Sequence, residues 1–173
     1  MKIKKSKISA DSLTKKYLPS DYNEAYEIIV KANNRLTPDN MLIVFWTDFP
    51  AWVRWLLYLR DMLVKPFGLK GTDDNYNSFR QNFTEMVCTS GNYKQMSIPA
   101  KRENETVIQL ADRHLTTELS CRIENILDNK LKISIITLVH YHNTFGKVYF
   151  NVIKPFHKII VKTMMKRTVA NLK

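Results

Sequence analysis

The stretch HLTTELSCRIENILDNKLKISIITLVHY, residues 114–141, decides the fold. On either side of its middle, every second residue is apolar or a threonine. A period of two is typical of β-strands, because successive side chains of a strand point to opposite faces of the sheet. The pattern therefore predicts two strands, at 114–123 and 130–141, joined as a hairpin.

The register of this hairpin follows from the same side chains. Pairing Ile123 with Ile133, and Leu115 with Tyr141, puts both apolar faces on one side of the sheet. A slip of one residue would turn one of the two faces outward, so only this register buries both. It leaves a three-residue loop that ends at Asn129, a residue type that tolerates positive φ.

Further strands flank the hairpin. Residues 93–99 and 104–111 also alternate and are separated by short turns, so they extend the hairpin into an antiparallel meander. Near the N-terminus, residues 21–30 mix aromatic, β-branched and acidic side chains, which favours a strand over a short helix.

The C-terminal segment, 144–169, has the period of one long amphipathic helix. We expect its apolar face to comprise Phe145, Tyr149, Val152, Phe156, Ile160 and Thr163. Lysines spread over the opposite arc. A helix of this length needs a surface to cover, and the apolar side of the sheet supplies one. The expected fold class is therefore α+β, a curved antiparallel sheet wrapped around a long C-terminal helix.

A helix pair is expected between the first strand and the meander. Thr37 occupies an N-cap position before Pro38, and the first helix runs to about Trp46. A second helix restarts at Pro50 and carries tryptophan and leucine at helical spacing. Residues 70–92 have turn residues at both ends and irregular apolar spacing, so we expect a loop there with at most a short strand.

The net charge of +11 is concentrated at the two ends. Residues 1–20 carry six lysines against one aspartate, and residues 143–173 carry six lysines, one arginine and no acid. The sequence thus predicts a basic, partly mobile tail over 1–20 and a single domain over 21–173. The chain lacks the aromatic interleaving and the zinc or recognition-helix motifs of nucleic-acid binders, so we expect no nucleic-acid partner.

Two cysteines, Cys88 and Cys121, are too few for a disulfide framework. The N-terminus lacks the apolar run of a secretory signal, and no stretch has the roughly 20 apolar residues that cross a bilayer. These features favour a cytoplasmic location with reduced thiols and no transmembrane segment. The sequence says nothing about oligomeric state.

Three longer runs carry a family resemblance. They are PAWVRWLLYLRDMLVKPFGL at 50–69, ADRHLTTELS at 111–120 and TLVHYHNTFGKVYFNVIKPFHKIIVKTMMKR at 137–167. Together they resemble an uncharacterised bacterial family, domain of unknown function 2867, over most of residues 21–170. The resemblance implies a START-like, helix-grip fold of the birch-pollen-allergen group, with an apolar cavity between sheet and helix. It implies no catalytic residue and no cofactor.

A binding module for a small hydrophobic or amphipathic ligand is the leading functional hypothesis. The expected lining residues face the shared interior and include hydroxyl groups: Thr117, Leu119, Thr137, Tyr141, Tyr149 and Phe156. An enzyme of unknown class in the same cavity is one alternative. A protein that docks on a membrane or a partner through its basic termini is another.

Histidines 114, 140 and 142 and the nearby Glu118 suggest a metal site at first sight. Alternation places them on the sheet face opposite the apolar one, away from the expected cavity. We therefore expect ordinary surface or hydrogen-bonded histidines and no metal.

Overall fold

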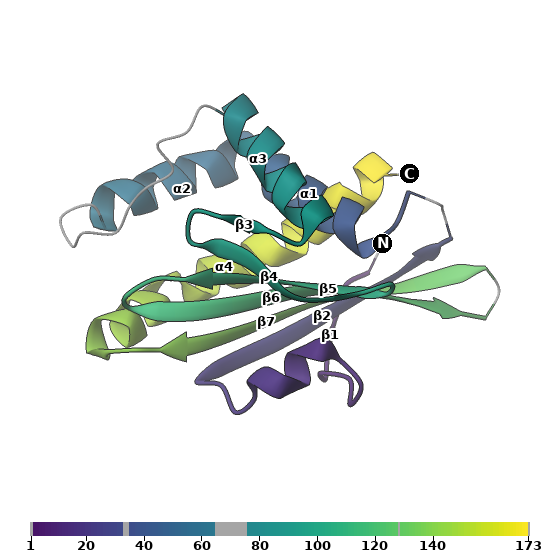
Figure 1. Ribbon diagram of the computed structural model, residues 1–173, viewed down its shortest axis with the longest axis horizontal. Coiled ribbons are helices and arrows are strands. Elements are labelled where there is room, and N and C mark those ends of the chain that lie inside the picture. The colour runs from purple at the N-terminus through teal and green to yellow at the C-terminus, as the bar shows by residue number, and fades with distance from the viewer. Residues whose placement is uncertain (1, 33–34, 65–75, 128, 173) are drawn as a thin grey trace.

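The computed structural model describes residues 2–32, 35–64, 76–127 and 129–172. A single antiparallel sheet has the strand order β1-β2-β7-β6-β5-β4-β3. Its helices gather on one face, and a 3-10 helix, η1, lies on the other (Figure 1). The strands are β1 (Lys4–Ser6), β2 (Tyr22–Lys31), β3 (Asn92–Tyr93), β4 (Met96–Arg102), β5 (Glu105–Ala111), β6 (Leu115–Ile126) and β7 (Lys130–Tyr141). The helices are η1 (Leu13–Tyr17), α1 (Pro38–Thr47), α2 (Ala51–Val64), α3 (Tyr76–Thr89) and α4 (Thr144–Leu172).

The predicted hairpin is confirmed residue for residue. In the β6–β7 pair, Ile123 lies opposite Ile133 and Leu115 opposite Tyr141. Asn129, in the loop, has a φ of 53°. The strand predicted at 21–30 is also confirmed, as β2, which pairs with β7 along its whole length. The meander is confirmed with shifted boundaries, since β4 begins at Met96 and a two-residue strand, β3, precedes it.

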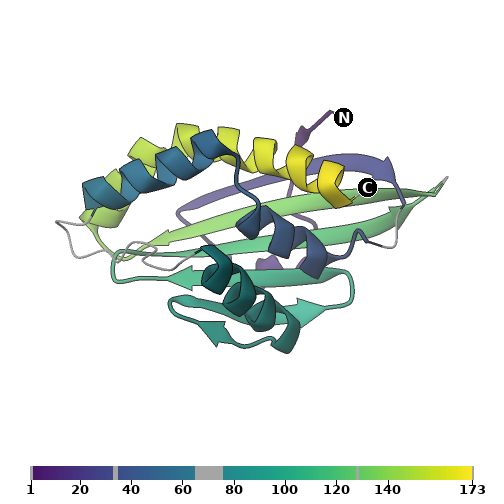
Figure 2. The same cartoon turned by 90° about the horizontal axis from the view of Figure 1, so that it is seen from above.

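The predicted helix pair is present. Thr37 Oγ1 accepts a hydrogen bond from the Asn40 amide at 3.2 Å, and Pro38 occupies the first turn of α1, as the N-cap signal indicated. α1 packs against α3 and α4, whereas α2 extends away from the sheet (Figure 1). Figure 2 shows α2 and the N-terminal half of α4 at the same end of the molecule.

The prediction of a loop over 70–92 is wrong, because residues 76–89 form α3. Phe79, Phe83, Met86 and Val87 recur at helical spacing and pack into the core. The flanking turn residues obscured this short apolar stripe in the sequence. The part of the prediction that covers 70–75 lies outside the described residues.

Where the sequence predicts an N-terminal tail, the structure has a strand and a 3-10 helix. β1 pairs with the outer edge of β2, with Ser6 opposite Ala25. Ser12 and Thr14 are buried, and η1 packs on the side of the sheet away from α4. Glu105 accepts a hydrogen bond from Ser12, and Tyr17 and Leu18 pack against an apolar cluster of β2 and β7 that includes Ala25 and Ile136. Alternation along the strands predicts one buried face and one solvent-exposed face, so it does not predict that this second face is buried as well.

The long C-terminal helix is confirmed, but its predicted apolar face is only partly right, because Tyr149 and Ile160 pack against buried clusters whereas Val152 and Phe156 are exposed. The residues of α4 that are buried are Gly146, Phe150, Val161, Met164, Met165, Thr168 and Val169. Val161, Met164, Met165 and Val169 share a cluster with sheet residues that include Cys121, Ile133 and Ile135, and Phe150 packs with Leu115 and Val139. Val152 and Phe156, which the sequence placed on the apolar face, point away from the core. The helix is therefore rotated by more than a quarter turn from the expected orientation.

Candidate functional site

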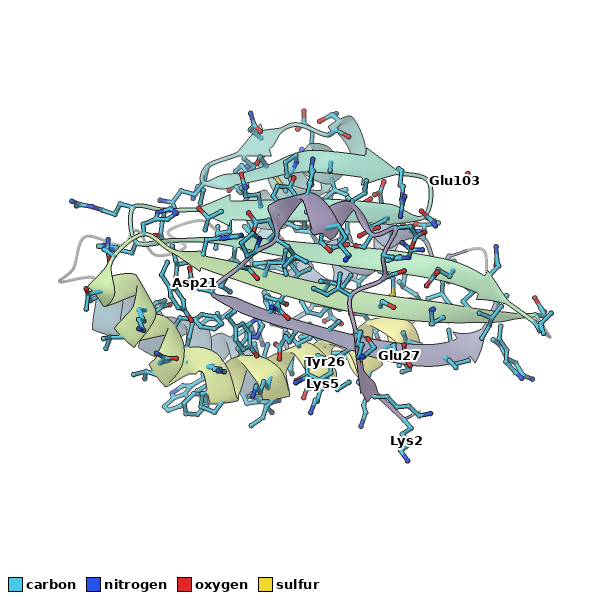
Figure 3. All side chains as sticks on the ribbon, turned by 90° about the horizontal axis from the view of Figure 1, so that it is seen from below. Lys2, Lys5, Asp21, Tyr26, Glu27 and Glu103 are labelled. Carbon is cyan, nitrogen blue, oxygen red and sulfur yellow. The ribbon has the colours of Figure 1, made fainter. Side chains whose placement is uncertain are left out.

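A carboxylate lies among apolar residues where α4 crosses β2. Glu24 is on the same face of β2 as Tyr22 and Tyr26, because the three residues are two apart in a strand. α4 contributes His157, one turn before the buried Val161. Figure 3 shows α4 running beside β2, the strand that carries Tyr26 and Glu27.

The side chains of this cluster are hydrogen-bonded to one another. His157 Nδ1 lies 2.9 Å from Glu24 Oε1. The hydroxyls of Tyr22 and Tyr26 donate to Glu24 Oε2 at 2.7 and 3.0 Å. Both carboxylate oxygens thus have partners, which a carboxylate that is only 3% exposed requires. We call these four residues the Glu24 cluster.

Lysines of α4 cover the outer side of the cluster. Lys154 Nζ lies 4.6 Å from the Tyr22 ring centroid, and Lys162 Nζ lies 4.8 Å from that of Tyr26. These distances fit cation–π contacts. Phe150 closes the inner side, with its ring 4.9 Å from Tyr22 and 6.1 Å from His157.

The surroundings set the protonation of the cluster. Burial raises the pKa of Glu24, but hydrogen bonds from His157 and the two tyrosines outweigh it and hold the pKa below its ordinary 4.5. Burial and the bond to Glu24 raise the pKa of Tyr26 to about 12 and raise that of Tyr22 further. Near neutral pH the cluster therefore holds an ionised carboxylate that accepts from two protonated tyrosines.

Five of the six residues predicted to line a cavity lie near this cluster. The cross-strand pairs Glu24–Thr137 and Thr137–Leu119 place Thr137 and Leu119 on the same face as Glu24. Thr117 lies in the next such row, opposite Val139, which in turn lies opposite Tyr22. Tyr141 and Tyr149 pack with Phe150 in one apolar cluster.

Phe156 does not belong with them. Its side chain is 50% exposed, so the prediction that it lines the interior is wrong. The exposure of Phe156 follows from the rotation of α4, which places Phe150 and His157 on the side of the helix that faces the sheet.

Thr137 carries a polar atom that the described residues leave without a hydrogen-bond partner. Its Oγ1 is buried directly beside Glu24 in the register. A buried hydroxyl without a partner costs about 1–3 kcal/mol, so its presence here asks for an explanation. Thr117, Tyr141 and Tyr149 on the same side are only partly buried, and they mark the end at which this interior meets solvent.

The Glu24 cluster was not predicted from the sequence. One signal was available, namely a glutamate on the otherwise apolar alternating face Tyr22, Tyr26, Ile28 and Val30. The partner, His157, was hidden by the wrong choice of face on α4. Chemically, a histidine oriented by a buried carboxylate can position a polar group or exchange a proton with it.

His140 of β7, and His114 and His142 next to the ends of β6 and β7, have ordinary partners. His140 Nε2 lies 3.3 Å from Glu118 Oε2, and His142 Nε2 lies 3.0 Å from Thr116 Oγ1. His114 Nδ1 lies 3.1 Å from Asn143 Nδ2, and its ring packs on Phe145. Among the residues that the structure describes, no three histidine, cysteine or acidic side chains are grouped as metal ligands.

Replacing Glu24 by glutamine is expected to reduce the dependence of stability on acid. The folded-state pKa of Glu24 lies below the unfolded value, so its stabilising effect is present above about pH 4.5 and is lost as the pH falls through the folded pKa. Glutamine cannot ionise and removes this contribution. Near pH 7 it also weakens three hydrogen bonds, which costs about 1–3 kcal/mol.

Urea unfolding followed by circular dichroism, at about pH 7 and about pH 4, measures both effects. The free energy of unfolding of the wild type is expected to fall more between the two pH values than that of Glu24→Gln. Glu103→Gln, at an exposed turn, is the matched control and should keep the wild-type profile. An identical acid profile for Glu24→Gln and the wild type would contradict the assignment.

Comparison with known proteins identifies one family. The family model described as "Protein of unknown function (DUF2867)" matches residues 18–164, most of the chain. No curated protein and no solved structure matches this chain. The matched range includes the Glu24 cluster on both β2 and α4. None of the described helices is both long and apolar enough to cross a bilayer.

Proposed function

The chain belongs to the DUF2867 family, and from the arrangement of its own residues we propose that it is a binding module for a small amphipathic molecule held between the sheet and α4. The order of the elements supports a place among the START-like helix-grip proteins. A helix pair follows β2, and a long C-terminal helix covers one face of an antiparallel sheet.

The observation that carries the proposal is the unpartnered hydroxyl of Thr137. It lies on an apolar face, beside the ionised Glu24, and the described residues offer it no hydrogen bond. A ligand with a carbonyl or hydroxyl group at one end would supply the missing partner. Its apolar body would lie along Leu119 and Thr117 towards Tyr141 and Tyr149, where the interior meets solvent.

The Glu24 cluster supports this role as an orienting group. Glu24 already accepts from three donors, so it disfavours a second acidic group nearby and favours a neutral polar end on the ligand. The tyrosines and His157 keep the carboxylate in place. The ligand we propose is therefore uncharged at its buried end and apolar along its length.

The test uses the fluorescent naphthyl ketone prodan, which has an apolar body and one carbonyl acceptor. Prodan emission should shift to the blue on binding. Thr137→Val should weaken the affinity for prodan about three- to tenfold, because the complex loses one hydrogen bond. The same substitution should stabilise the free protein by about 1 kcal/mol, because it removes an unpaired buried hydroxyl. A substitution that weakens ligand binding but stabilises the free protein indicates that the replaced side chain serves to bind the ligand.

Thr168→Val is the matched control. Thr168 Oγ1 is also buried and without a partner among the described residues, but it lies in the last turns of α4. This variant should gain similar stability and keep the affinity for prodan. The proposal fails if prodan does not bind, or if the two valine variants bind it equally.

A further inference from the structure

The side of α4 that faces away from the sheet carries a row of exposed apolar side chains. Val148, Val152, Phe156 and Ile159 follow one another at spacings of four, four and three residues, which places them along one line of the helix. Each is 50–64% exposed. A helix that packs only against its own sheet carries polar residues on this side, so the row indicates a contact with something else.

A second exposed row lies on α2. Trp52, Trp55 and Tyr58 are three residues apart and are 42–69% exposed. α2 and the N-terminal half of α4 lie at the same end of the molecule in two perpendicular views (Figures 1 and 2). We call these two exposed rows, taken together, the α2/α4 apolar surface.

Lysines border this surface along α4. At about 100° per residue, Lys147, Lys158, Lys162 and Lys166 lie on the flank between the exposed row and the buried face. α4 contains no aspartate or glutamate at all. The helix therefore carries its exposed apolar side chains and its lysines on adjacent sides.

We propose that the α2/α4 apolar surface docks on an anionic lipid bilayer. Exposed aliphatic and aromatic side chains enter the interface between headgroups and acyl chains, and neighbouring lysines meet the lipid phosphates. Tryptophan and tyrosine favour this region because their rings are apolar with one polar end. The molecule rests on the bilayer surface, since none of its described helices is suited to cross one.

Charge favours lipid over the other occupants. A second copy of the chain would bring the same row of lysines to the contact, and each copy has a net charge of +11. The two described grooves, of about 470 and 310 Å³, are lined by residues of α3 and of the β1–β2 region, not by the α2/α4 surface.

The test is co-sedimentation of the full chain with vesicles of phosphatidylcholine alone or mixed with phosphatidylserine. We expect binding to the mixed vesicles, a weaker response at high salt, and a blue shift of tryptophan fluorescence as Trp52 and Trp55 leave water. Val152→Ser/Phe156→Ser should lower binding at least tenfold with an unchanged melting temperature. Lys158→Gln/Lys166→Gln should lower it about tenfold and reduce the salt dependence.

Matched controls lie elsewhere on the surface. Ile29→Ser removes an apolar side chain of the same exposure from β2, and Lys2→Gln/Lys31→Gln removes two exposed lysines. Both should bind as the wild type does. The proposal is overturned if mixed and neutral vesicles bind equally, if the controls lose as much binding as the surface variants, or if ultracentrifugation shows self-association that Val152→Ser/Phe156→Ser abolishes.

Discussion

Glu105→Ala is expected to destabilise the fold by about 3–5 kcal/mol, the cost of breaking a fully buried ion pair. Glu105 is 0% exposed and lies on the sheet face that η1 covers. Its Oε1 accepts from Ser12 Oγ at 2.6 Å and from Ser120 Oγ at 2.7 Å. Its Oε2 accepts from the Leu13 amide and from Arg102 Nη2, both at 3.0 Å.

A buried arginine makes the substitution more costly. Arg122 is 3% exposed, and its Nη1 lies 3.6 Å from Glu105 Oε2. Removing the carboxylate leaves this cation with Asp11, which is largely exposed, and with Glu124. Two serine hydroxyls and one amide also lose their acceptor. Because Ser12 and Leu13 belong to the N-terminal segment, we expect η1 to come away from the sheet.

Chemical unfolding measures the loss, and limited proteolysis within residues 2–20 reports the release of η1. Glu103→Ala, two residues away at an exposed turn, should stay within about 0.5 kcal/mol of the wild type. If an unpaired charge is the cause, the double variant Glu105→Leu/Arg122→Met should be more stable than Glu105→Ala. A Glu105→Ala protein as stable as the Glu103→Ala control would refute the account.

Gly146→Ala is expected to cost about 3 kcal/mol, although alanine favours a helix by about 1 kcal/mol over glycine. A Cβ at this position would lie 2.1 Å from the carbonyl oxygen of His114 and 2.9 Å from its carbonyl carbon. These are backbone atoms, and the same oxygen accepts a hydrogen bond from the His142 amide at 2.9 Å. The strand end and the first turn of α4 would have to separate.

Thermal unfolding of Gly146→Ala against Gly91→Ala tests this directly. At Gly91 the nearest atom to a new Cβ is the side-chain hydroxyl of Thr89, at 3.0 Å, which can rotate away. We expect the Gly91 variant to lose much less stability. Equal melting temperatures for the two variants would show that the contact at Gly146 relaxes easily.

The hairpin register could be predicted because it depends on local information. The alternation in β6 and β7 leaves one pairing that buries both apolar faces, and the structure has that pairing. The boundaries of α1 were equally local, since its first turn carries an N-cap and a proline. Such features need no knowledge of distant parts of the chain.

The face of α4 could not be predicted in the same way. Apolar residues occur on two sides of this helix, with Phe150 and Val161 on one and Val152 and Phe156 on the other. Periodicity alone does not distinguish a stripe that packs on the sheet from one that faces outward. The error had a further consequence, because it concealed His157 and with it the pairing to Glu24 across 133 residues.

The N-terminal segment was missed for a different reason. Its lysines suggested a solvated tail, but the acceptors for Ser12 and Leu13 belong to Glu105, far along the chain. A polar contact of this kind leaves no apolar period in the sequence. Only the fold brings Ser12 and Leu13 next to Glu105.

The borders of the sheet bear on how these molecules behave at high concentration. One border is β1, three residues long with two lysines, and the other is β3, two residues long. An open backbone edge can recruit a strand from another molecule and begin a fibril, and brief or charged edges hinder that growth. We therefore expect the short outermost strands to hinder amyloid-like polymerisation at both borders of the sheet.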